Sequence, residues 1–467
     1  MKQLKMPSAY TILITLILIV AALTWILPAG QYQYMSDGEP ITGTYAQVAR
    51  NGQSLIDVVR APLSGLYEAI EIAVFILTVG GFLGVIGKTG AIDVGIASIV
   101  TRLGNKGGVL IPILMAIFAL GGTTFGMAEE TIAFYPLLIP VMVAAGYDTV
   151  TAVSVILLGA GAGVLGSTVN PFATGIASGF AGVSMGENIG LRLIILVLSL
   201  GLSMGFVMLY AKRVHADPQQ SLVAAQREEN LRHFAVKQQN DAKLTGKQRL
   251  ALWLFALTFA VMIYGVIPFA DMGITWLPTL GWWFPELSAL FWVAAVLIGI
   301  LCRVGEKEIV DGFVSGAADL LGVAFIIGIS RGITVIMNSG MITDTILRWG
   351  EEALSGMGGI GFVLASFGIF VVLSFLIPSS SGLATLSMPI MAPLAEMTGV
   401  NRALMVTAYQ SASGLVNLIT PTSAVVMGAL AIGHVSYGVW LKYIWKLLLV
   451  LTVLCLVCLT VGTLMGA

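Results

Sequence analysis

Apolar segments recur along almost the whole chain, and they restrict its fold more than any other feature of the sequence. A helix of about 20 apolar residues crosses the hydrocarbon core of a bilayer, whereas shorter runs interrupted by Gly, Pro and Ser are typical of re-entrant or broken helices. Both kinds occur here, at about 10–27, 67–87, 109–122, 128–145, 149–165, 190–211, 250–268, 287–302, 320–337, 360–376, 384–398, 403–416 and 440–465. The sequence therefore predicts an all-α polytopic membrane protein.

The composition agrees with a chain whose solvent is lipid. Of the 467 residues, 57% are hydrophobic and 10% are charged, whereas soluble proteins have about 25% charged residues. The formal net charge of −1 includes no basic excess, so nucleic acid is not an expected partner. Cys302, Cys455 and Cys458 lie in or beside apolar segments, where we expect them to pack as small hydrophobic side chains without a disulfide or a metal ion.

An internal repeat is the most informative pattern in the chain. Four groups of residues return about 250 positions further on, as inverted or parallel repeats do in transporters. The longest match joins Tyr135-Pro136 to Pro140, followed by Gly146-Tyr147-Asp148, to Met388-Pro389 to Pro393, followed by Gly399-Val400-Asn401. Ser64-Gly65 and Glu68 match Ser315-Gly316 and Asp319. Thr89-Gly90 matches Ser339-Gly340, and Pro171 matches Pro421. These anchors predict a duplicated unit.

A hydrophilic stretch separates the two copies. It carries more Lys and Arg than Asp and Glu, so the positive-inside rule predicts that it is cytoplasmic. The expected organisation is a first transmembrane helix with an external loop (1–56), repeat 1 (57–211), the basic linker (212–249), two connecting transmembrane helices (250–304) and repeat 2 (305–467).

The distribution of positive charge also predicts an orientation. With a cytoplasmic N-terminus, repeat 1 begins outside and brings Lys88, Arg102 and Lys106 to the cytoplasm. Repeat 2 then begins inside, so the repeats are inverted and the C-terminus is external. Each repeat is expected to contain a re-entrant hairpin and a broken helix, with hairpin tips at about 121–127 and 377–383 and helix breaks at about 166–171 and 417–423.

Hairpin tips and helix breaks are where a solute site is expected. They leave backbone N–H and C=O groups without helical partners at membrane depth, and a bound solute or ion can satisfy those groups. The small hydrogen-bonding side chains there are Thr123, Thr124, Ser167, Thr168, Asn170, Ser379, Ser380, Ser381, Asn417, Thr420, Thr422 and Ser423. The alternative is that these residues only cap helices in ordinary loops.

Glu129 and Glu130 are the sharpest single signal, because carboxylates in an apolar segment are functional candidates. They can bind an ammonium or guanidinium group, take up a coupling proton or hold Na⁺; alternatively, they pair with the N-terminus of the next helix. Arg331 lies inside another apolar segment and can bind a carboxylate or neutralise a glutamate. Pairing with Asp319 is the structural alternative.

Several classes of protein are disfavoured. His215, His233 and His434 form no evident cluster, and the chain has neither a Ser-His-Asp arrangement nor a phosphate-binding or ATPase motif. An enzyme and an ATP-driven pump are therefore not expected. An ion channel is disfavoured because the polar groups are local to the tips and do not form a continuous helix face.

The motifs together resemble the DcuC/YfcC family over nearly the whole chain. They are Gly-Met-Ala-Glu-Glu-Thr-Ile-Ala-Phe from Gly126, Asn170-Pro171-Phe172, Ser-Ser-Ser-Gly-Leu-Ala-Thr-Leu-Ser-Met-Pro from Ser379, and Thr420-Pro421-Thr422-Ser423. The resemblance implies a prokaryotic cytoplasmic-membrane carrier of C4-dicarboxylates or basic amino acids. It also implies a scaffold domain and a mobile domain working as an elevator, and a homodimer.

In carriers of this kind, Ser-Asn-Thr-type tips bind substrate carboxylates and flank Na⁺ sites. By this resemblance, Na⁺ would lie near Gly126, Asn170, Gly382 and Thr420, although both tips here lack the Asn. No other cofactor than a coupling Na⁺ or H⁺ is expected. The paired glutamates favour a cationic amino acid such as arginine or ornithine, because two uncompensated carboxylates repel a dianion; an H⁺- or Na⁺-coupled C4-dicarboxylate carrier is the alternative.

Overall fold

The computed structural model describes residues 9–35, 40–41, 43–92, 94–95, 107–234, 245–266, 269–270, 274, 276–354 and 356–466. Arg102 and Lys106, used above for orientation, and linker residues 235–244 lie outside this part of the chain. The described residues are overwhelmingly helical, with one short antiparallel ribbon in which β1 (Gly30–Gln31) pairs with β2 (Ala46–Gln47). The all-α fold class is therefore confirmed.

The helices follow the apolar segments closely. Up to the linker they are α1 (Ala9–Ile26), α2 (Leu55–Glu68), α3 (Ile70–Lys88), α5 (Gly107–Phe125), η2 (Glu129–Phe134), α6 (Tyr135–Ala144), α7 (Thr149–Leu165), η3 (Pro171–Gly175), α8 (Ile176–Ala181), α9 (Ile189–Ala216), η4 (Pro218–Gln220), η5 (Ala224–Gln226) and α10 (Arg227–His233). After it they are α11 (Gly246–Val266), α12 (Phe284–Leu301), α13 (Glu306–Asp319), α14 (Leu321–Ser339), α15 (Thr343–Leu354), α16 (Gly359–Leu376), α17 (Ser380–Met397), α18 (Arg402–Val416), α19 (Ala424–Ile432) and α20 (Tyr437–Met465).

Within the described ranges, seven helices are long and apolar enough to cross a membrane, judged by length and composition. They are α3, α9, α11, α12, α14, α16 and α20, and the shorter helices α1, α5 and α7 are also apolar. The described helices are therefore those expected of a multi-span membrane protein.

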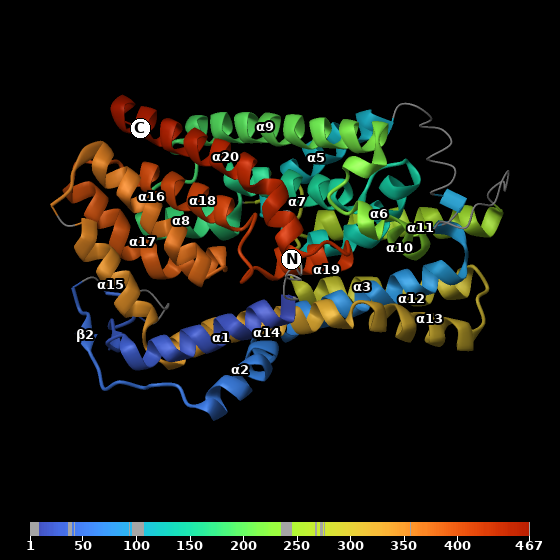
Figure 1. The fold of residues 1–467 in the computed structure, drawn as a ribbon, viewed down its shortest axis with the longest axis horizontal. Coiled ribbons are helices and arrows are strands. Elements are labelled where there is room, and N and C mark those ends of the chain that lie inside the picture. Colours follow the sequence, from blue (N-terminus) through green and yellow to red (C-terminus); the bar gives the residue numbers. More distant parts are fainter. Residues whose placement is uncertain are drawn as a thin grey trace, which may run out of the picture.

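The helices form two layers that run along the long axis of the molecule (Figure 1). The paired-helix layer consists of α1, α2, α3, α11, α12, α13 and α14. The hairpin layer consists of α5 to α9 and α16 to α20, with α9 and α20 packed against each other. Phe82 packs edge-on against Phe291 in the paired-helix layer, and Phe370 against Tyr409 in the hairpin layer. The buried cluster around Phe82 also includes Ile132 and Ala133 of η2, so apolar packing continues from one layer into the other.

Small residues bring the backbones of the paired-helix layer close together. Gly65 of α2 faces the carbonyl oxygen of Gly328 in α14, and Gly80 of α3 faces that of Gly316 in α13. A Cβ atom built on Gly80 would lie 2.4 Å from the Gly316 oxygen, so no larger side chain fits without moving a helix. Such close approach is typical of helix pairs in membranes, where small residues let backbones pack directly. The two pairs, α2 with α14 and α13 with α3, match under the internal repeat.

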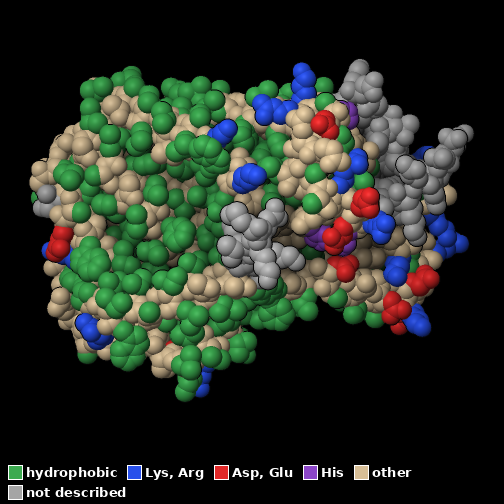
Figure 2. Space-filling model, viewed as in Figure 1, with side chains coloured by type: hydrophobic (Ala, Val, Ile, Leu, Met, Phe, Trp, Pro, Cys, Tyr) green, Lys and Arg blue, Asp and Glu red, His purple; other side chains and the backbone are tan. Residues whose placement is uncertain are grey.

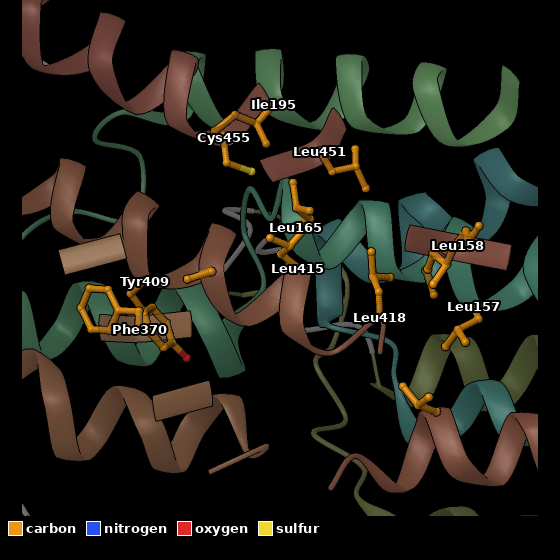
Figure 3. Packing of buried hydrophobic residues seen from close by; sticks show 14 of the residues in the cluster. Leu157, Leu158, Leu165, Ile195, Phe370, Tyr409, Leu415, Leu418, Leu451 and Cys455 are labelled. Atoms are coloured by element: carbon orange, nitrogen blue, oxygen red, sulfur yellow. The ribbon is translucent and has the colours of Figure 1, made fainter. Parts of the chain in front are cut away.

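Buried contacts in the hairpin layer join its two broken helices. Figure 3 shows Leu165 of α7 beside Leu415 of α18, with Ile195 and Cys455 in the same buried cluster. The Gln410 amide of α18 also donates to the Leu165 carbonyl oxygen at 3.4 Å. The interrupted ends of α7 and α18 are thus held against each other inside this layer.

The repeated Gly-x-Asp/Asn motif builds the same turn twice. Gly146 and Gly399 follow α6 and α17 with φ of +89° and +75°, a left-handed conformation that glycine adopts without strain. Two residues later, Asp148 accepts from the Thr151 N–H at 2.8 Å, and Asn401 accepts from the Ala403 N–H at 2.8 Å. These side chains cap α7 and α18, so each broken helix begins after an equivalent corner.

Charged side chains gather at one end of the molecule. Figure 2 shows Lys, Arg, Asp and Glu over α10, α11 and α13, whereas the rest of the visible face is mainly hydrophobic. The start of the linker folds back against this end, where Ser221 donates to the Asp148 carboxylate at 2.6 Å.

The sequence predicts no cluster of histidines, but two histidines that are distant in sequence meet where the linker folds back. The rings of His233 and His434 lie 4.3 Å apart between centroids. Burial and the neighbouring His233 hold the pKa of His434 below its ordinary value, with Glu229 acting in the opposite direction. The contact depends on tertiary folding, which is why spacing in the sequence did not indicate it.

Candidate functional site

A cavity of about 230 Å³ lies between the two layers. Ligand pockets in proteins usually measure roughly 300–1,000 Å³, so this one is suited to a small metabolite. The hairpin layer contributes the tip that follows α5, the tip that precedes α17, and both helix breaks. The paired-helix layer contributes Ile72 of α3, Trp283 and Phe284 at the start of α12, and Ser330 and Arg331 of α14.

The first tip turns at Gly126, directly after α5. Gly126 has a φ of +74°, and a Cβ atom there would lie 2.6 Å from the Asn170 side chain. Both the backbone conformation and the lack of space call for glycine at this position. The chain then enters η2, a 3₁₀ helix whose first two residues are Glu129 and Glu130. The turn therefore presents both carboxylates to the cavity.

The two carboxylates differ in their surroundings. Glu130 is buried and accepts a hydrogen bond from the Ala128 N–H at 3.1 Å, whereas Glu129 is half-buried. Their like charges repel each other, and the positive charge of Arg331 attracts Glu129. The described residues that line the cavity thus include two acids and one base.

Hydrogen bonds join the break that follows α7 to the end of α5 in the first hairpin. The Thr168 N–H donates to the Thr123 hydroxyl at 3.0 Å, and the Thr123 hydroxyl reaches the Gly166 carbonyl oxygen at 3.1 Å. Behind the break, the buried guanidinium of Arg192 donates to the Thr168 carbonyl oxygen at 3.2 Å. The unwound backbone is therefore held open by side chains instead of by helical hydrogen bonds.

Side-chain hydrogen bonds also hold the second break, which follows α18. Thr422 donates its hydroxyl to the carbonyl oxygen of Phe375, near the end of α16, at 2.8 Å. The Trp440 indole donates to the Leu418 carbonyl oxygen at 2.9 Å, and the Tyr437 hydroxyl to that of Ile419 at 2.8 Å. The Ser330 hydroxyl of α14 donates to the Thr422 carbonyl oxygen, which links the second break to the other layer.

The structure divides the residues predicted for the site into two groups. Those that line the cavity are Gly126, Glu129, Glu130, Asn170, Ser379, Ser380, Ser381, Asn417, Thr422 and Ser423. Those that lie outside its lining are Thr123, Thr124, Ser167, Thr168, Thr420 and Gly382.

The second group makes contacts within the protein. The Ser167 hydroxyl lies 2.7 Å from that of Thr174, which donates to Gln410 of α18 at 2.6 Å. Thr124 donates back to the Leu120 carbonyl oxygen of its own helix at 2.6 Å, and the Thr420 hydroxyl pairs with that of Thr422 at 2.7 Å. Ser167 and Thr420 thus stabilise the helix breaks, whereas Thr124 bonds within α5.

Ser330, Trp283 and Phe284 also line the cavity, although the sequence does not indicate them as site residues. Trp283 and Phe284 belong to the stretch predicted as two connecting transmembrane helices (250–304), in which no site residue was expected. Ser330 gave no signal of its own, although its neighbour Arg331 stood out as a charge in an apolar helix. The alternative pairing of Arg331 with Asp319 does not occur among the described ion pairs.

Comparison with known proteins identifies the family. The sequence profile of the DcuC family, described as a C4-dicarboxylate anaerobic carrier, matches residues 6–464. A Haemophilus influenzae protein described as uncharacterized is 32% identical, covering 96% of this chain and 95% of its own length. The Escherichia coli protein described as "Putative basic amino acid antiporter YfcC" is 30% identical, covering 94% of this chain and 93% of its own length.

The chain belongs to the DcuC family. The resemblance seen in its motifs is thereby confirmed, and the protein is a multi-pass membrane transporter of small molecules; this family points to a carrier rather than an enzyme. This DcuC-family chain is also similar to the YdaH transporter of Alcanivorax borkumensis, at 16% identity and a TM-score of 0.42, covering 98% of this chain and 99% of the other. It is similar to Neisseria gonorrhoeae MtrF, from a class described as antimetabolite efflux pumps, at 15% identity and a TM-score of 0.43, covering 99% and 96%.

Proposed function

We propose that this DcuC-family protein is a secondary transporter that carries basic amino acids such as arginine and ornithine across a prokaryotic cytoplasmic membrane, by exchange or by coupling to an ion. The observation that carries the proposal is the pair Glu129 and Glu130 at one cavity that also contains Arg331. With these groups ionised, the cavity has a net negative charge and attracts a solute with two cationic groups. A related protein is described as a basic amino acid antiporter, which supports the same substrate class.

The mechanism that we infer is an elevator movement of the hairpin layer against the paired-helix layer. The cavity is lined by residues of both layers, so movement of one layer against the other changes the surroundings of a bound solute. The equivalent ties of the breaks, Thr168 to Thr123 and Thr422 to Phe375, support a duplicated unit with inverted repeats. A homodimer is expected from the family resemblance and stays a prediction.

The orientation follows from the positive-inside rule. The Lys and Arg side chains gathered over α10, α11 and α13 (Figure 2) lead us to place that end of the molecule in the cytoplasm. We propose that the N-terminus is also cytoplasmic, whereas the C-terminus, at the end of α20 away from the charged end (Figure 1), is external.

A C4-dicarboxylate carrier is the second candidate. Arg331 supports it because a guanidinium binds carboxylates, and so does the description of the family. In that case Glu129 and Glu130 must be neutralised by protons or by Na⁺ when the dianion binds, since bare carboxylates would repel it.

Thermal stabilisation of the purified protein distinguishes the two substrates. Arginine, ornithine, lysine, succinate, fumarate and lactate are each added in Na⁺ and in choline buffers, and the melting temperature is recorded. A ligand that binds only the folded protein raises this temperature by mass action. We expect the basic amino acids to raise it; a rise with dicarboxylates alone, above all only in Na⁺, would favour the second candidate.

A further inference from the structure

Arg331 occupies an unusual position. It lies in the apolar helix α14, it is half-buried, and it lines the cavity. Neither a hydrogen bond nor an ion pair joins its guanidinium to another residue in the described part of the chain. A cation at membrane depth is costly unless it is paired or hydrated, which makes this group a strong candidate for ligand binding.

The backbone around Arg331 is held firmly. Gly65 of α2 packs against the Gly328 carbonyl oxygen and the Gly332 N–H, on either side of Arg331. Ser330, the preceding residue, donates to the carbonyl oxygen of Thr422 in the second helix break. The position from which the guanidinium extends is therefore fixed by both layers, as a binding group requires.

Arg331 has no charged counterpart in the first repeat unit. In the alignment of the two units that matches Gly65 with Gly316, the position of Arg331 corresponds to Gly80. Gly80 has no space for a side chain because it packs on the Gly316 backbone. Likewise, the second repeat has no pair of acids equivalent to Glu129 and Glu130. The cavity therefore carries opposite charges on two different elements, η2 and α14.

We propose that Arg331 binds the α-carboxylate of a zwitterionic substrate while Glu129 and Glu130 bind its amino and side-chain cations. This inference rests on the proposed function and deepens it. Two acids and one base complement a basic amino acid, which has two cationic groups and one carboxylate. A planar guanidinium can bind a carboxylate with two parallel hydrogen bonds, which fixes the orientation of the substrate.

The inference makes the free carboxylate a requirement for binding. Agmatine is arginine without its carboxylate, so it keeps the guanidinium and an amine but gives Arg331 nothing to bind. Truncation of one partner in a buried charged pair typically weakens binding by about 30-fold or more. We therefore expect the unaltered protein to bind arginine at least about 30-fold more tightly than agmatine.

The experiment measures the dissociation constants of arginine and agmatine by titration calorimetry on the purified full chain. The variants are Arg331→Ala and Arg331→Lys, and Arg249→Ala at the exposed start of α11 is the matched control. We expect Arg331→Ala to bind the two ligands within about threefold of each other and Arg331→Lys to keep part of the preference, since lysine retains the charge but not the planar fork. Arg249→Ala should behave as the unaltered protein.

Each other outcome contradicts the inference in a distinct way. Equal affinity of the unaltered protein for arginine and agmatine means that the carboxylate is not recognised. An equal loss of both affinities in Arg331→Ala, restored by adding Glu129→Gln, means that Arg331 only neutralises Glu129. If Arg331→Ala does not fold, Arg331→Lys decides: a preference for arginine smaller than that of the unaltered protein supports the inference, and an unchanged preference contradicts it. Binding of succinate with no binding of either arginine or agmatine overturns the proposed function itself.

Discussion

At the scale of single residues, Glu130 has the most constrained environment in the cavity. Its side chain is buried, one of its oxygens accepts from the Ala128 N–H, and Glu129 beside it carries a like charge. Two acids this close to each other at membrane depth are unfavourable in the absence of a cation. A cationic substrate, Na⁺ or a proton resolves that conflict.

Substitution of Glu130 tests whether its charge is required for transport. We expect Glu130→Gln, which keeps the shape and removes the charge, to lower arginine uptake by about 10²-fold or more while expression and melting temperature stay near those of the unaltered protein. Uptake into cells that express each variant provides the measurement, with Glu306→Gln at the exposed start of α13 as the control. Unchanged uptake in Glu130→Gln would remove this residue from the site.

The sequence was informative about single residues where a charged side chain lies in an apolar segment. Glu129, Glu130 and Arg331 stood out because a charge in an apolar segment needs a reason. Thr123 and Ser167 were predicted with equal weight, yet they lie behind the cavity and hydrogen-bond to the protein. A polar side chain at a helix break looks the same in sequence whether it faces a ligand or another helix.

At the scale of elements, the first hairpin tip and the first helix break act as one unit. Thr123 bonds to Gly166 and Thr168, and Gly126 fits directly against Asn170. Movement of the tip therefore moves the break and both glutamates with it.

Gly126→Ala should disturb that unit locally. A side chain in the left-handed region costs about 1–2 kcal/mol, and the added methyl group would also press on Asn170. We expect a modest decrease in melting temperature and a larger loss of ligand-induced stabilisation. Gly87→Ala in α3 is the control, because no other group lies within 4 Å of the added Cβ atom. Full ligand stabilisation in Gly126→Ala would show that this packing does not matter for binding.

Element boundaries were predictable where hydrophobicity changes sharply. The apolar segments at 149–165 and 360–376 coincide with α7 and α16 almost residue for residue. The helices α2 and α13 were not recognised as elements of their own, because each mixes apolar residues with charges such as Asp57 and Glu308. Their pairing with α14 and α3 depends on glycine contacts between distant parts of the chain.

At the scale of the whole molecule, the cavity lies between two layers, and the side chains that line it come from both. This arrangement explains how a solute bound at the cavity can be sensitive to the relative position of the layers. The pairing of the hairpins and breaks under the internal repeat stays a prediction. The participation of α12 and α14 could not be predicted in the same way, because it follows from how the layers pack and not from any local pattern.

Counterflow in proteoliposomes tests the central claim most directly. Vesicles that contain the purified protein are loaded with unlabelled arginine, ornithine or succinate, or left empty, and then diluted into a trace of labelled arginine or labelled succinate. We predict that labelled arginine accumulates in vesicles loaded with arginine or ornithine and not in empty or succinate-loaded vesicles. Accumulation of labelled succinate in succinate-loaded vesicles, without any counterflow of arginine, would contradict the account and make this protein a dicarboxylate carrier.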